Sequence, residues 1–265
     1  MIPKIIHLYW HDKKKLPYIV KKCIKNIKEK NKDFTVKLYD KKFIMSKLTN
    51  IKDGYEQFIS DIFRLYILYF EGGVYLDSSI LCLNNIECMF DFNLNKLQGY
   101  ETPWGGLNIE NYCMCSNKGN KLVYYWLIEC IVANNVSFKV YKKYYEHLAS
   151  EKLKRFLPYL TNFLAYNVAC KKLFGKIVNE NEYMKLLIKS SDINGPLYYL
   201  KMFKENNIKA NSLKSVNYLL NQEKLPYQNC IIKLRGEERK LMNKLILEKK
   251  YNKNSLIIKL LFNYK

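Results

Sequence analysis

The stretch GGVYLDSS at residues 72–79 decides the fold of this chain, because it joins a tight turn to a buried strand. Two successive glycines let the backbone reverse sharply. The short apolar run that follows predicts a strand that is too apolar for a sheet edge and ends at Asp77. Ligands of open α/β sheets bind beyond the carboxyl ends of the strands. We therefore expect Asp77 to hold a divalent cation or a ribose hydroxyl against a diphosphate, whereas an aspartate considered in isolation is more typical of a plain turn.

Upstream of this turn, residues 55–70 are apolar on nearly every face, which predicts a buried helix. Asp61 and Arg64 lie three residues apart in this helix, so their side chains leave the same face. Burying a charge is costly unless the charge is paired. The two residues therefore either satisfy each other as an ion pair or face a polar pocket. In a pocket, Arg64 would bind a phosphate or sugar oxygen with its planar fork, and Asp61 would accept hydrogen bonds from sugar hydroxyls.

The remaining elements alternate near the N-terminus and become helical later. The β-α-β-α order at the beginning favours a doubly wound α/β sheet. Further strands are expected at residues 4–10, 34–39, 80–83, 96–100 and 112–115, with a helix from Pro17 to about Lys30. Helices dominate from Gly119 onward, at about 120–134, 163–174, 180–189, 196–205 and 237–250. The apolar tail, residues 255–262, is expected to pack back on the protein or to contact a membrane.

The formal net charge of +21 over 265 residues favours polyanionic partners such as nucleic acid, an acidic membrane surface or phosphate-bearing ligands. Lysines are spread from Lys4 to Lys265, however, so a solvated surface explains the charge better than a dedicated patch. The eight cysteines have irregular spacing, without a zinc or C-x-x-C redox pattern. No apolar run is long enough to span a membrane. We expect reduced thiols and a cytoplasmic protein, with peripheral membrane contact left open.

Two separate blocks of sequence together form a recognisable pattern. They comprise IPKIIH at residues 2–7, Trp10, Ser60-Asp61, Arg64, Leu68-Tyr69, Gly72-Gly73, Tyr75 and Asp77. In order and spacing, this pattern resembles the DXD-containing sugar transferases of glycosyltransferase family 32, the capsular polysaccharide synthesis proteins and the clostridial glucosylating toxins. The resemblance covers roughly residues 2–83.

The resemblance implies one GT-A-type, Rossmann-like domain over residues 1–265, with a donor-binding part at about 1–118 and a mainly helical acceptor side at about 119–265. Members of such families transfer a hexose-type sugar from a nucleotide sugar to a glycan, glycolipid or protein hydroxyl, typically with retention. A UDP-sugar is favoured over a GDP-sugar, and Mn²⁺ or Mg²⁺ is the usual cofactor. No specific nucleic-acid partner is expected.

The resemblance also implies roles for individual residues. Trp10 would stack on the nucleobase, while Asp61 and Arg64 would hold the donor sugar and phosphate. Tyr75 would line the donor site. Asp77 would be the first aspartate of the D-x-D motif, in contact with ribose and metal. No catalytic base or nucleophile is identifiable from the sequence.

The chain departs from the family pattern at Ser79, which stands where the second aspartate of D-x-D binds the metal. A hydroxyl is a weaker cation ligand than a carboxylate, and basic side chains can replace part of a metal's charge. Lys233 lies in an Ile-Lys-Leu segment that resembles a His-Lys-Leu segment of the capsular-type proteins, so it would reach the diphosphate unless it is a surface lysine. The loop at 101–106, with Trp104, either covers the acceptor pocket or is a plain turn.

The alternative function is a catalytically degenerate, basic protein that binds nucleic acid or anionic surfaces. The net charge and Ser79 favour it, whereas the intact Asp61, Arg64 and Asp77 and the lack of a nucleic-acid motif disfavour it. A metal hydrolase is disfavoured because the chain has only three histidines and no H-E-x-x-H motif.

Overall fold

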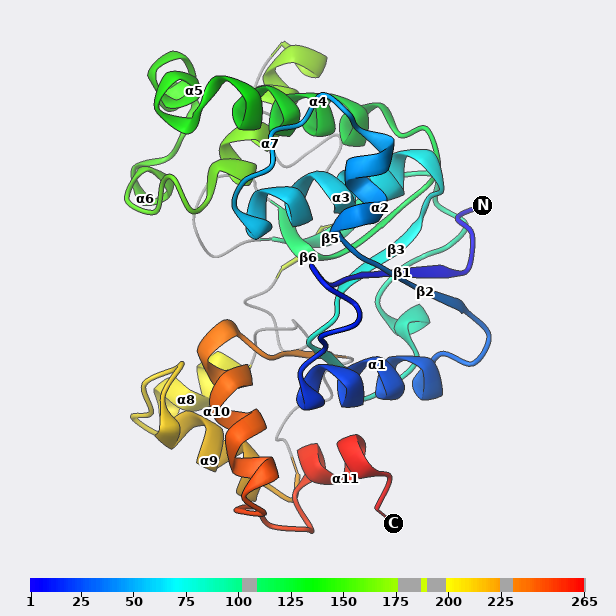
Figure 1. Cartoon of the computed structure of the whole chain (residues 1–265), viewed down its shortest axis with the longest axis vertical. Coiled ribbons are helices and arrows are strands. Elements are labelled where there is room, and N and C mark those ends of the chain that lie inside the picture. The colour runs from blue at the N-terminus through cyan, green and yellow to red at the C-terminus, as the bar shows by residue number, and fades with distance from the viewer. Residues whose placement is uncertain (102–108, 176–186, 190–198, 225–230, 265) are drawn as a thin grey trace. The chain divides into compact units, whose positions relative to one another are not determined.

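The computed structural model describes residues 1–101, 109–175, 187–189, 199–224 and 231–264 (Figure 1). The chain divides into two compact units whose segments alternate along the sequence. The first unit contains Met1–Lys13, Lys37–Leu76 and Phe90–Lys189, and the second contains Lys14–Val36, Asp77–Met89 and Ser190–Lys265. Two of the boundaries between the units fall within strands of the larger sheet, at Val36–Lys37 in β2 and at Leu76–Asp77 in β3.

A six-stranded mixed sheet forms the centre of the first unit. Its strand order is β2-β1-β3-β6-β5-β7. Strand β6 is antiparallel to both β3 and β5, whereas β7 is parallel to β5. The strands are β1 (Ile5–Tyr9), β2 (Thr35–Tyr39), β3 (Gly73–Asp77), β5 (Gln98–Glu101), β6 (Ile109–Ser116) and β7 (Leu187–Lys189). The predicted α/β class is therefore confirmed.

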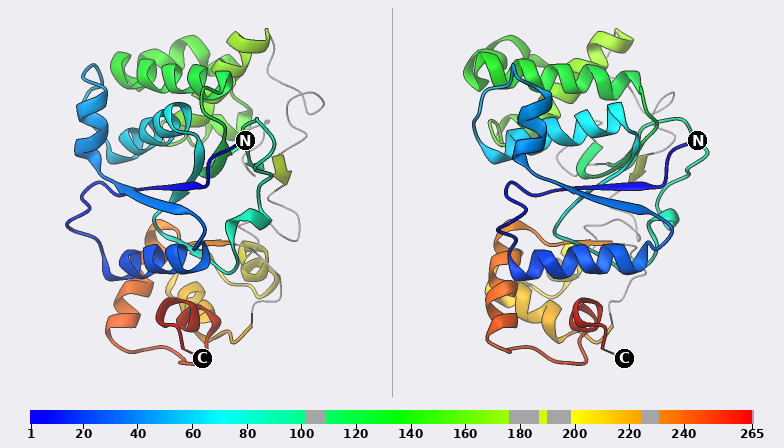
Figure 2. Two further views of the ribbon diagram at one scale, coloured as in Figure 1. Left: turned by 90° about the vertical axis from the view of Figure 1, so that its right-hand side faces the viewer. Right: turned by 45° about the vertical axis from the view of Figure 1, so that its right-hand side comes forward.

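Helices of the first unit are stacked on this sheet in layers. Helix α3 contacts β1 and β6 on one side and α4 on the other, and α4 packs on α7 (Figures 1 and 2). The helices of this unit are α2 (Lys41–Lys47), α3 (Glu56–Phe70), α4 (Lys121–Val136), α5 (Phe138–Tyr145), α6 (Glu151–Lys154) and α7 (Thr161–Phe174). The position of α3 between sheet and helix explains why its sequence is apolar nearly all round.

The second unit is mainly helical and contains a two-stranded antiparallel sheet of β4 and β8. Helix α11 packs on α1 and α9 (Figure 1). The apolar tail therefore packs back on the protein, the first of the two possibilities expected from the sequence. The elements are α1 (Tyr18–Lys30), β4 (Ile80–Cys82), the 3-10 helix η1 (Ile86–Cys88), α8 (Tyr199–Glu205), α9 (Leu213–Asn221), β8 (Ile231–Lys233), α10 (Gly236–Leu247) and α11 (Leu256–Phe262).

Two buried asparagines fix β4 and η1 to α1. The Asn26 side chain accepts a hydrogen bond from the backbone N–H of Cys82 at 2.7 Å and donates one to its carbonyl at 3.1 Å. The Asn31 side chain accepts from the backbone N–H of Ile86 at 2.7 Å. Each amide satisfies backbone groups that would be costly to bury without a hydrogen bond. Strand β4 is consequently held on one side by β8 and at its end by α1.

Two expectations from the sequence are wrong. Residues 187–189 form strand β7, not the end of a helix at 180–189, because their backbone pairs with β5; residues 180–186 lie outside the described part of the chain. Cys88 is disulfide-bonded, whereas reduced thiols were expected. Irregular cysteine spacing does not reveal which thiols the fold brings within bonding distance. No helix in the described ranges is both long enough and apolar enough to cross a membrane.

The Gly72-Gly73 turn brings β3 against β1. Gly73 has φ +96°, and a Cβ atom added there would lie 2.6 Å from the carbonyl oxygen of Ile5. The carbonyl of Gly72 accepts a 2.8 Å hydrogen bond from the Nε2–H of the buried His7. The other ring nitrogen, Nδ1, lies 3.3 Å from the Tyr39 hydroxyl oxygen. Burial lowers the pKa of His7 to about 4, so the imidazole is neutral at physiological pH. The turn is therefore set by backbone sterics and by one neutral histidine.

We predict that Gly73→Ala lowers the free energy of unfolding by about 3 kcal/mol or more. The strain of a positive φ in alanine and the overlap of its Cβ with the backbone of Ile5 both contribute to this loss. Gly119→Ala is the matched control. Gly119 also has a positive φ, +73°, but an added Cβ meets nothing within 4 Å, so the expected loss is about 1–2 kcal/mol. Urea denaturation of both variants measures the difference. Equal losses would contradict the close approach of β3 to β1.

Burial lowers the pKa of His7 from 6.5 to about 4, although its hydrogen bond to Gly72 acts in the opposite direction. The unfolded chain therefore binds a proton below pH 6.5 that the folded chain excludes until about pH 4. Stability linked to His7 is complete above pH 6.5 and is lost as the pH falls through this window. Between pH 6.5 and 4.5, we expect the free energy of unfolding to fall by about 2–3 kcal/mol more in the wild type than in His7→Gln. Identical pH profiles for the two proteins would refute this assignment.

Candidate functional site

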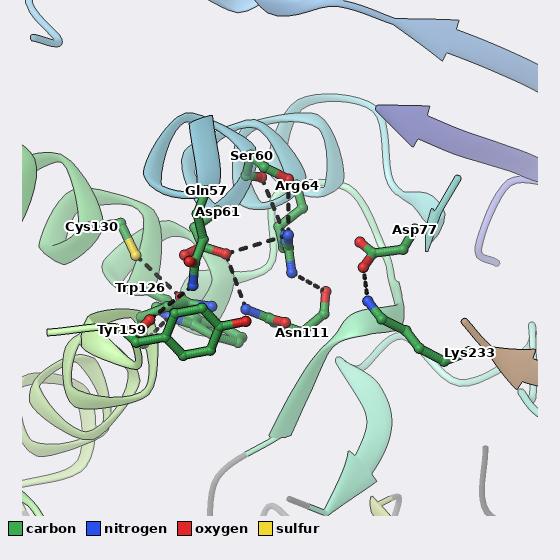
Figure 3. A network of polar contacts seen from close by, with 11 residues as sticks. Gln57, Ser60, Asp61, Arg64, Asp77, Asn111, Trp126, Cys130, Tyr159 and Lys233 are labelled. Carbon is green, nitrogen blue, oxygen red and sulfur yellow. Dashed lines mark hydrogen bonds and ion pairs between the residues drawn. The ribbon is translucent and has the colours of Figure 1, made fainter. Parts of the chain in front are cut away.

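A buried ion pair lies on α3 in the first unit. The Nη2 atom of Arg64 is 3.4 Å from Oδ1 of Asp61, and the two side chains are only 6% and 4% exposed. Both extend from the same side of α3 (Figure 3). The Nδ2–H of Asn111 on β6 donates to the same Asp61 oxygen at 3.1 Å. The sequence predicted that these side chains share a face, and the structure confirms it.

The guanidinium of Arg64 is held in one orientation by its neighbours. Its Nε–H and Nη2–H donate to the backbone carbonyl and hydroxyl of Ser60, at 3.2 and 2.9 Å. Its Nη1–H donates to the carbonyl of Asn111 at 2.8 Å. The guanidinium carbon is also 4.9 Å from the centre of the Tyr75 ring, a cation–π geometry. A guanidinium fixed in this way loses little conformational entropy when it binds an anion.

Tyr75 lies on β3 and is fully buried. Burial raises the pKa of its phenol, while the nearby Arg64 acts to lower it. The tyrosine is therefore neutral at physiological pH and serves as the surface on which the guanidinium rests. This places Tyr75 beside Arg64.

A hollow beside Asp61 has a volume of about 20 Å³ and is lined by Phe58, Asp61, Cys130, Ala133, Asn134, Phe138, Thr161 and Asn162. A volume of roughly 10–15 Å³ is needed for one water molecule. The hollow therefore has room for about one water and not for a sugar ring.

Trp10 follows β1 and is half-buried. Its backbone N–H donates to the carbonyl of Tyr39 at 3.1 Å, which fixes its position beside β2. Its ring lies 5.3 Å from the His11 ring, centre to centre, with an interplanar angle of 37°. Because the indole is only half-buried, part of it is accessible, and a role in base stacking requires such access.

Asp77 and Lys233 form an ion pair in the second unit. Oδ2 of Asp77 is in direct contact with Nζ of Lys233, and the two side chains point toward each other (Figure 3). They are 21% and 19% exposed, so solvent reaches both. Lys233 belongs to β8, where it is paired with Ile80 of β4. The lysine predicted to reach a diphosphate is therefore placed at the first aspartate of the motif.

Ser79 is held by β8 and α10. Its hydroxyl donates to the carbonyl of Leu234 at 3.1 Å and accepts from Nη1–H of Arg239 at 3.4 Å. Its own carbonyl accepts from the backbone N–H of Leu234 at 3.0 Å. Only 3% of the residue is exposed. The hydroxyl that occupies the second position of the motif thus already has a donor and an acceptor.

These residues do not fit the divalent cation that the family resemblance implies. Mn²⁺ and Mg²⁺ prefer several oxygen ligands, usually carboxylates. Here the Asp77 carboxylate is paired with an ammonium, and the Ser79 hydroxyl bonds to a backbone carbonyl and a guanidinium. Within the described ranges, no group of three or more histidine, cysteine, aspartate or glutamate side chains is arranged to hold a metal ion.

Two residues of these clusters were missed from the sequence. Asn111 lies on β6 and contacts Asp61, whereas Arg239 lies on α10 and contacts Ser79; both are far along the chain from their partners. An asparagine in a strand and an arginine in a charged helix carry no local signal of such a role. Burial lowers the pKa of Arg239, and a fully buried, neutral Cys23 lies nearby. The predicted acceptor loop with Trp104 lies mostly outside the described residues.

Residues 1–130 match the family described as capsular polysaccharide synthesis protein, which confirms the resemblance noted in the motifs. No curated protein sequence matches the chain.

Three solved glycosyltransferase structures are similar to the chain. The PaToxG glycosyltransferase is 19% identical, with a TM-score of 0.36 over 63% of this chain and 77% of that one. The glycosyltransferase GlyE of Streptococcus pneumoniae TIGR4 is 12% identical, with a TM-score of 0.44 over 99% of this chain and 64% of that one. A glycosyltransferase involved in glycosylation of the major capsid of PBCV-1 is 13% identical, with a TM-score of 0.46 over 93% of this chain and 100% of that one. This chain spans less than two thirds of the GlyE structure.

We predict that Arg64→Met lowers the free energy of unfolding by about 3–5 kcal/mol, because it removes the cation beside the buried Asp61 carboxylate. Arg64→Lys keeps the charge but loses the planar fork that reaches Ser60 and Asn111, so its expected loss is about 1–3 kcal/mol. Urea denaturation of the two variants tests this order. If Arg64→Met proves as stable as the wild type, Arg64 does not stabilise the buried carboxylate of Asp61.

Proposed function

We propose that this chain, whose first 130 residues match the capsular polysaccharide synthesis family, is a GT-A-type glycosyltransferase. It transfers a hexose-type sugar from a nucleotide sugar, preferentially a UDP-sugar, to a hydroxyl of a glycan, glycolipid or protein, with retention. The observation that carries this proposal is the buried, pre-oriented guanidinium of Arg64 beside the Asp61 carboxylate. A cation of fixed orientation next to a carboxylate, which accepts hydrogen bonds from hydroxyl groups, is suited to a ligand that carries both phosphate and sugar.

The reaction breaks the bond between C1 of the donor sugar and an oxygen of the diphosphate. The electron pair of that bond leaves with the nucleoside diphosphate, a new C1–O bond forms to the acceptor, and the proton of the acceptor hydroxyl passes to the departing diphosphate. The protein's main contribution is to position the reactants and to stabilise the charge that develops on the leaving group. Because its surroundings already orient it, Arg64 needs little reorganisation to do this.

We assign the donor contacts residue by residue. Trp10 stacks on the nucleobase, which its half-buried position after β1 allows. Asp61 accepts hydrogen bonds from the sugar hydroxyls, and Arg64 binds a sugar or phosphate oxygen. Asp77, the last residue of β3, contacts the ribose, while its ion-pair partner Lys233 contacts the diphosphate.

The domain organisation completes this proposal. Residues from about 1 to 118 carry the donor contacts apart from Lys233, and the mainly helical residues from about 119 to 265 supply the acceptor side. Acceptors differ more in shape than nucleoside diphosphates do, and surface loops vary more in sequence among related proteins than the elements that they connect. We therefore assign acceptor choice to the helical part.

A screen of UDP- and GDP-sugars for release of the nucleoside diphosphate tests the function. We expect turnover with at least one UDP-sugar and a loss of about 100-fold or more in Asp77→Asn and Arg64→Lys, because each variant removes a charge or donor aimed at the donor substrate. Lys240→Met is the control, since Lys240 is an exposed residue of α10 and its variant should keep full activity.

The rival function makes a different prediction in the same preparation. A basic protein that binds nucleic acid or anionic surfaces without specificity loses affinity steeply as salt rises. Failure of every nucleotide sugar to bind in calorimetry, together with salt-sensitive binding of DNA, would establish the rival and exclude the glycosyltransferase.

A further inference from the structure

We propose that this glycosyltransferase works without a divalent cation, and that Lys233 and Arg239 take the place of the metal at the Asp77–Ser79 segment. The inference rests on the proposed function, because it concerns how the same site meets the charge of the donor diphosphate. The observations that lead to it all lie within the second unit.

The first observation is the ion pair of Asp77 with Lys233. Oδ2 of the carboxylate, one of the two oxygens through which Asp77 could bind a metal, is in direct contact with the lysine ammonium. A divalent cation at this carboxylate would lie beside a positive charge, and the repulsion would weaken its binding. The ammonium itself provides a positive charge at the same place.

The second observation is the hydrogen bonding of Ser79. The hydroxyl proton is directed to the carbonyl of Leu234, and a hydroxyl lone pair accepts from Arg239. A metal bound to this hydroxyl would lie beside the positive charge of the guanidinium, at a residue that is only 3% exposed. The cation beside the second motif position is therefore Arg239.

The third observation is that both cations are placed by rigid backbone. Lys233 is locked in register by the β4–β8 pairing, opposite Ile80. Strand β4 is in turn held to α1 by the buried Asn26, which bonds to both backbone groups of Cys82. Arg239 lies on the fourth position of α10. Charges held in this way are already in place when the leaving group forms, which is the condition for electrostatic catalysis.

The chemistry of the two side chains suits the task. Together an ammonium and a guanidinium carry two positive charges, the same as one Mn²⁺ ion. The ammonium offers donors from a compact charge, and the guanidinium matches pairs of phosphate oxygens with its planar fork. When the C1–O bond of the donor breaks, the electron pair passes to the diphosphate oxygen. Lys233 and Arg239 then stabilise that negative charge.

Two measurements on the full-length protein test this inference directly. Calorimetry compares UDP binding in EDTA with binding in Mn²⁺, and the dissociation constants are expected to agree within about twofold. Electron paramagnetic resonance of Mn²⁺ reports metal binding independently of activity. After correction for the Mn²⁺ bound by UDP alone, adding the protein is expected to leave the free-ion signal unchanged.

Variants identify the residues responsible. Lys233→Met and Arg239→Met are each expected to weaken UDP binding in EDTA by about 10-fold or more, the usual effect of losing a charge-assisted hydrogen bond. Lys240→Met, which removes the neighbouring exposed lysine of α10, is the matched control and is expected to bind UDP normally. Circular dichroism confirms that each variant is folded.

A charge reversal provides an independent test. Lys233→Glu places a second carboxylate opposite Asp77 and removes the ammonium. This variant is expected to lose UDP binding in EDTA and to recover part of it in Mn²⁺, with a matching fall in the free-ion signal. The same variant bearing Asp77→Asn is expected to lose the recovery.

The possible outcomes separate the inference from the proposed function. If UDP binds to the wild type only with Mn²⁺, or if the wild type binds one Mn²⁺ that Asp77→Asn abolishes, the inference is overturned and the glycosyltransferase stands. If UDP and all nucleotide sugars fail to bind in either condition, the proposed function fails and the inference fails with it. Equal binding in EDTA and Mn²⁺, lost in Lys233→Met and Arg239→Met, supports both.

Discussion

The backbone of Gly73 approaches the carbonyl of Ile5 so closely that only a residue without a Cβ fits between them. This contact sets the position of β3 against β1, and the buried His7 holds the preceding carbonyl. The positions of two side chains that we propose to lie at the donor site depend on that placement. Tyr75 lies in the middle of β3 under the guanidinium of Arg64, and the final residue of the strand is Asp77. A shift of β3 would therefore disturb the cation in the first unit and the carboxylate in the second.

Charge in this protein is organised by local pairing, and the net charge of +21 does not predict where the important cations lie. Arg64 is almost completely buried and is oriented by three hydrogen bonds to neighbouring oxygens. Lys233 is one lysine among many in composition, yet it contacts the Asp77 carboxylate because β8 pairs with β4. A cation held in a fixed geometry contributes more to binding a diphosphate than many solvated lysines do, since exposed charges are screened.

Several elements could be predicted because their signals are local. Helix α3 was expected from an apolar run of helical length, and β3 from a short apolar segment between a glycine turn and an aspartate. The error at β7 has a tertiary cause: its backbone pairs with β5, and this pairing overrides the local periodicity. Strand β8 and the disulfide of Cys88 were missed for the same reason, because each depends on a partner elsewhere in the chain.

The sequence by itself determined the α/β class, the burial of the Asp61–Arg64 helix face and the position of Asp77 at a strand end. These follow from periodicity, from turn chemistry and from the cost of burying charge, all of which act over a few residues. Only the tertiary structure decided which cations lie at Asp77 and Ser79. Lys233 follows Asp77 by 156 positions and Arg239 follows Ser79 by 160. The pairing of β8 with β4 places Lys233 at Asp77, and Arg239 lies on α10, the helix that follows β8. The charge of a side chain can be read from a sequence, but the groups that it contacts depend on the packing of the whole chain.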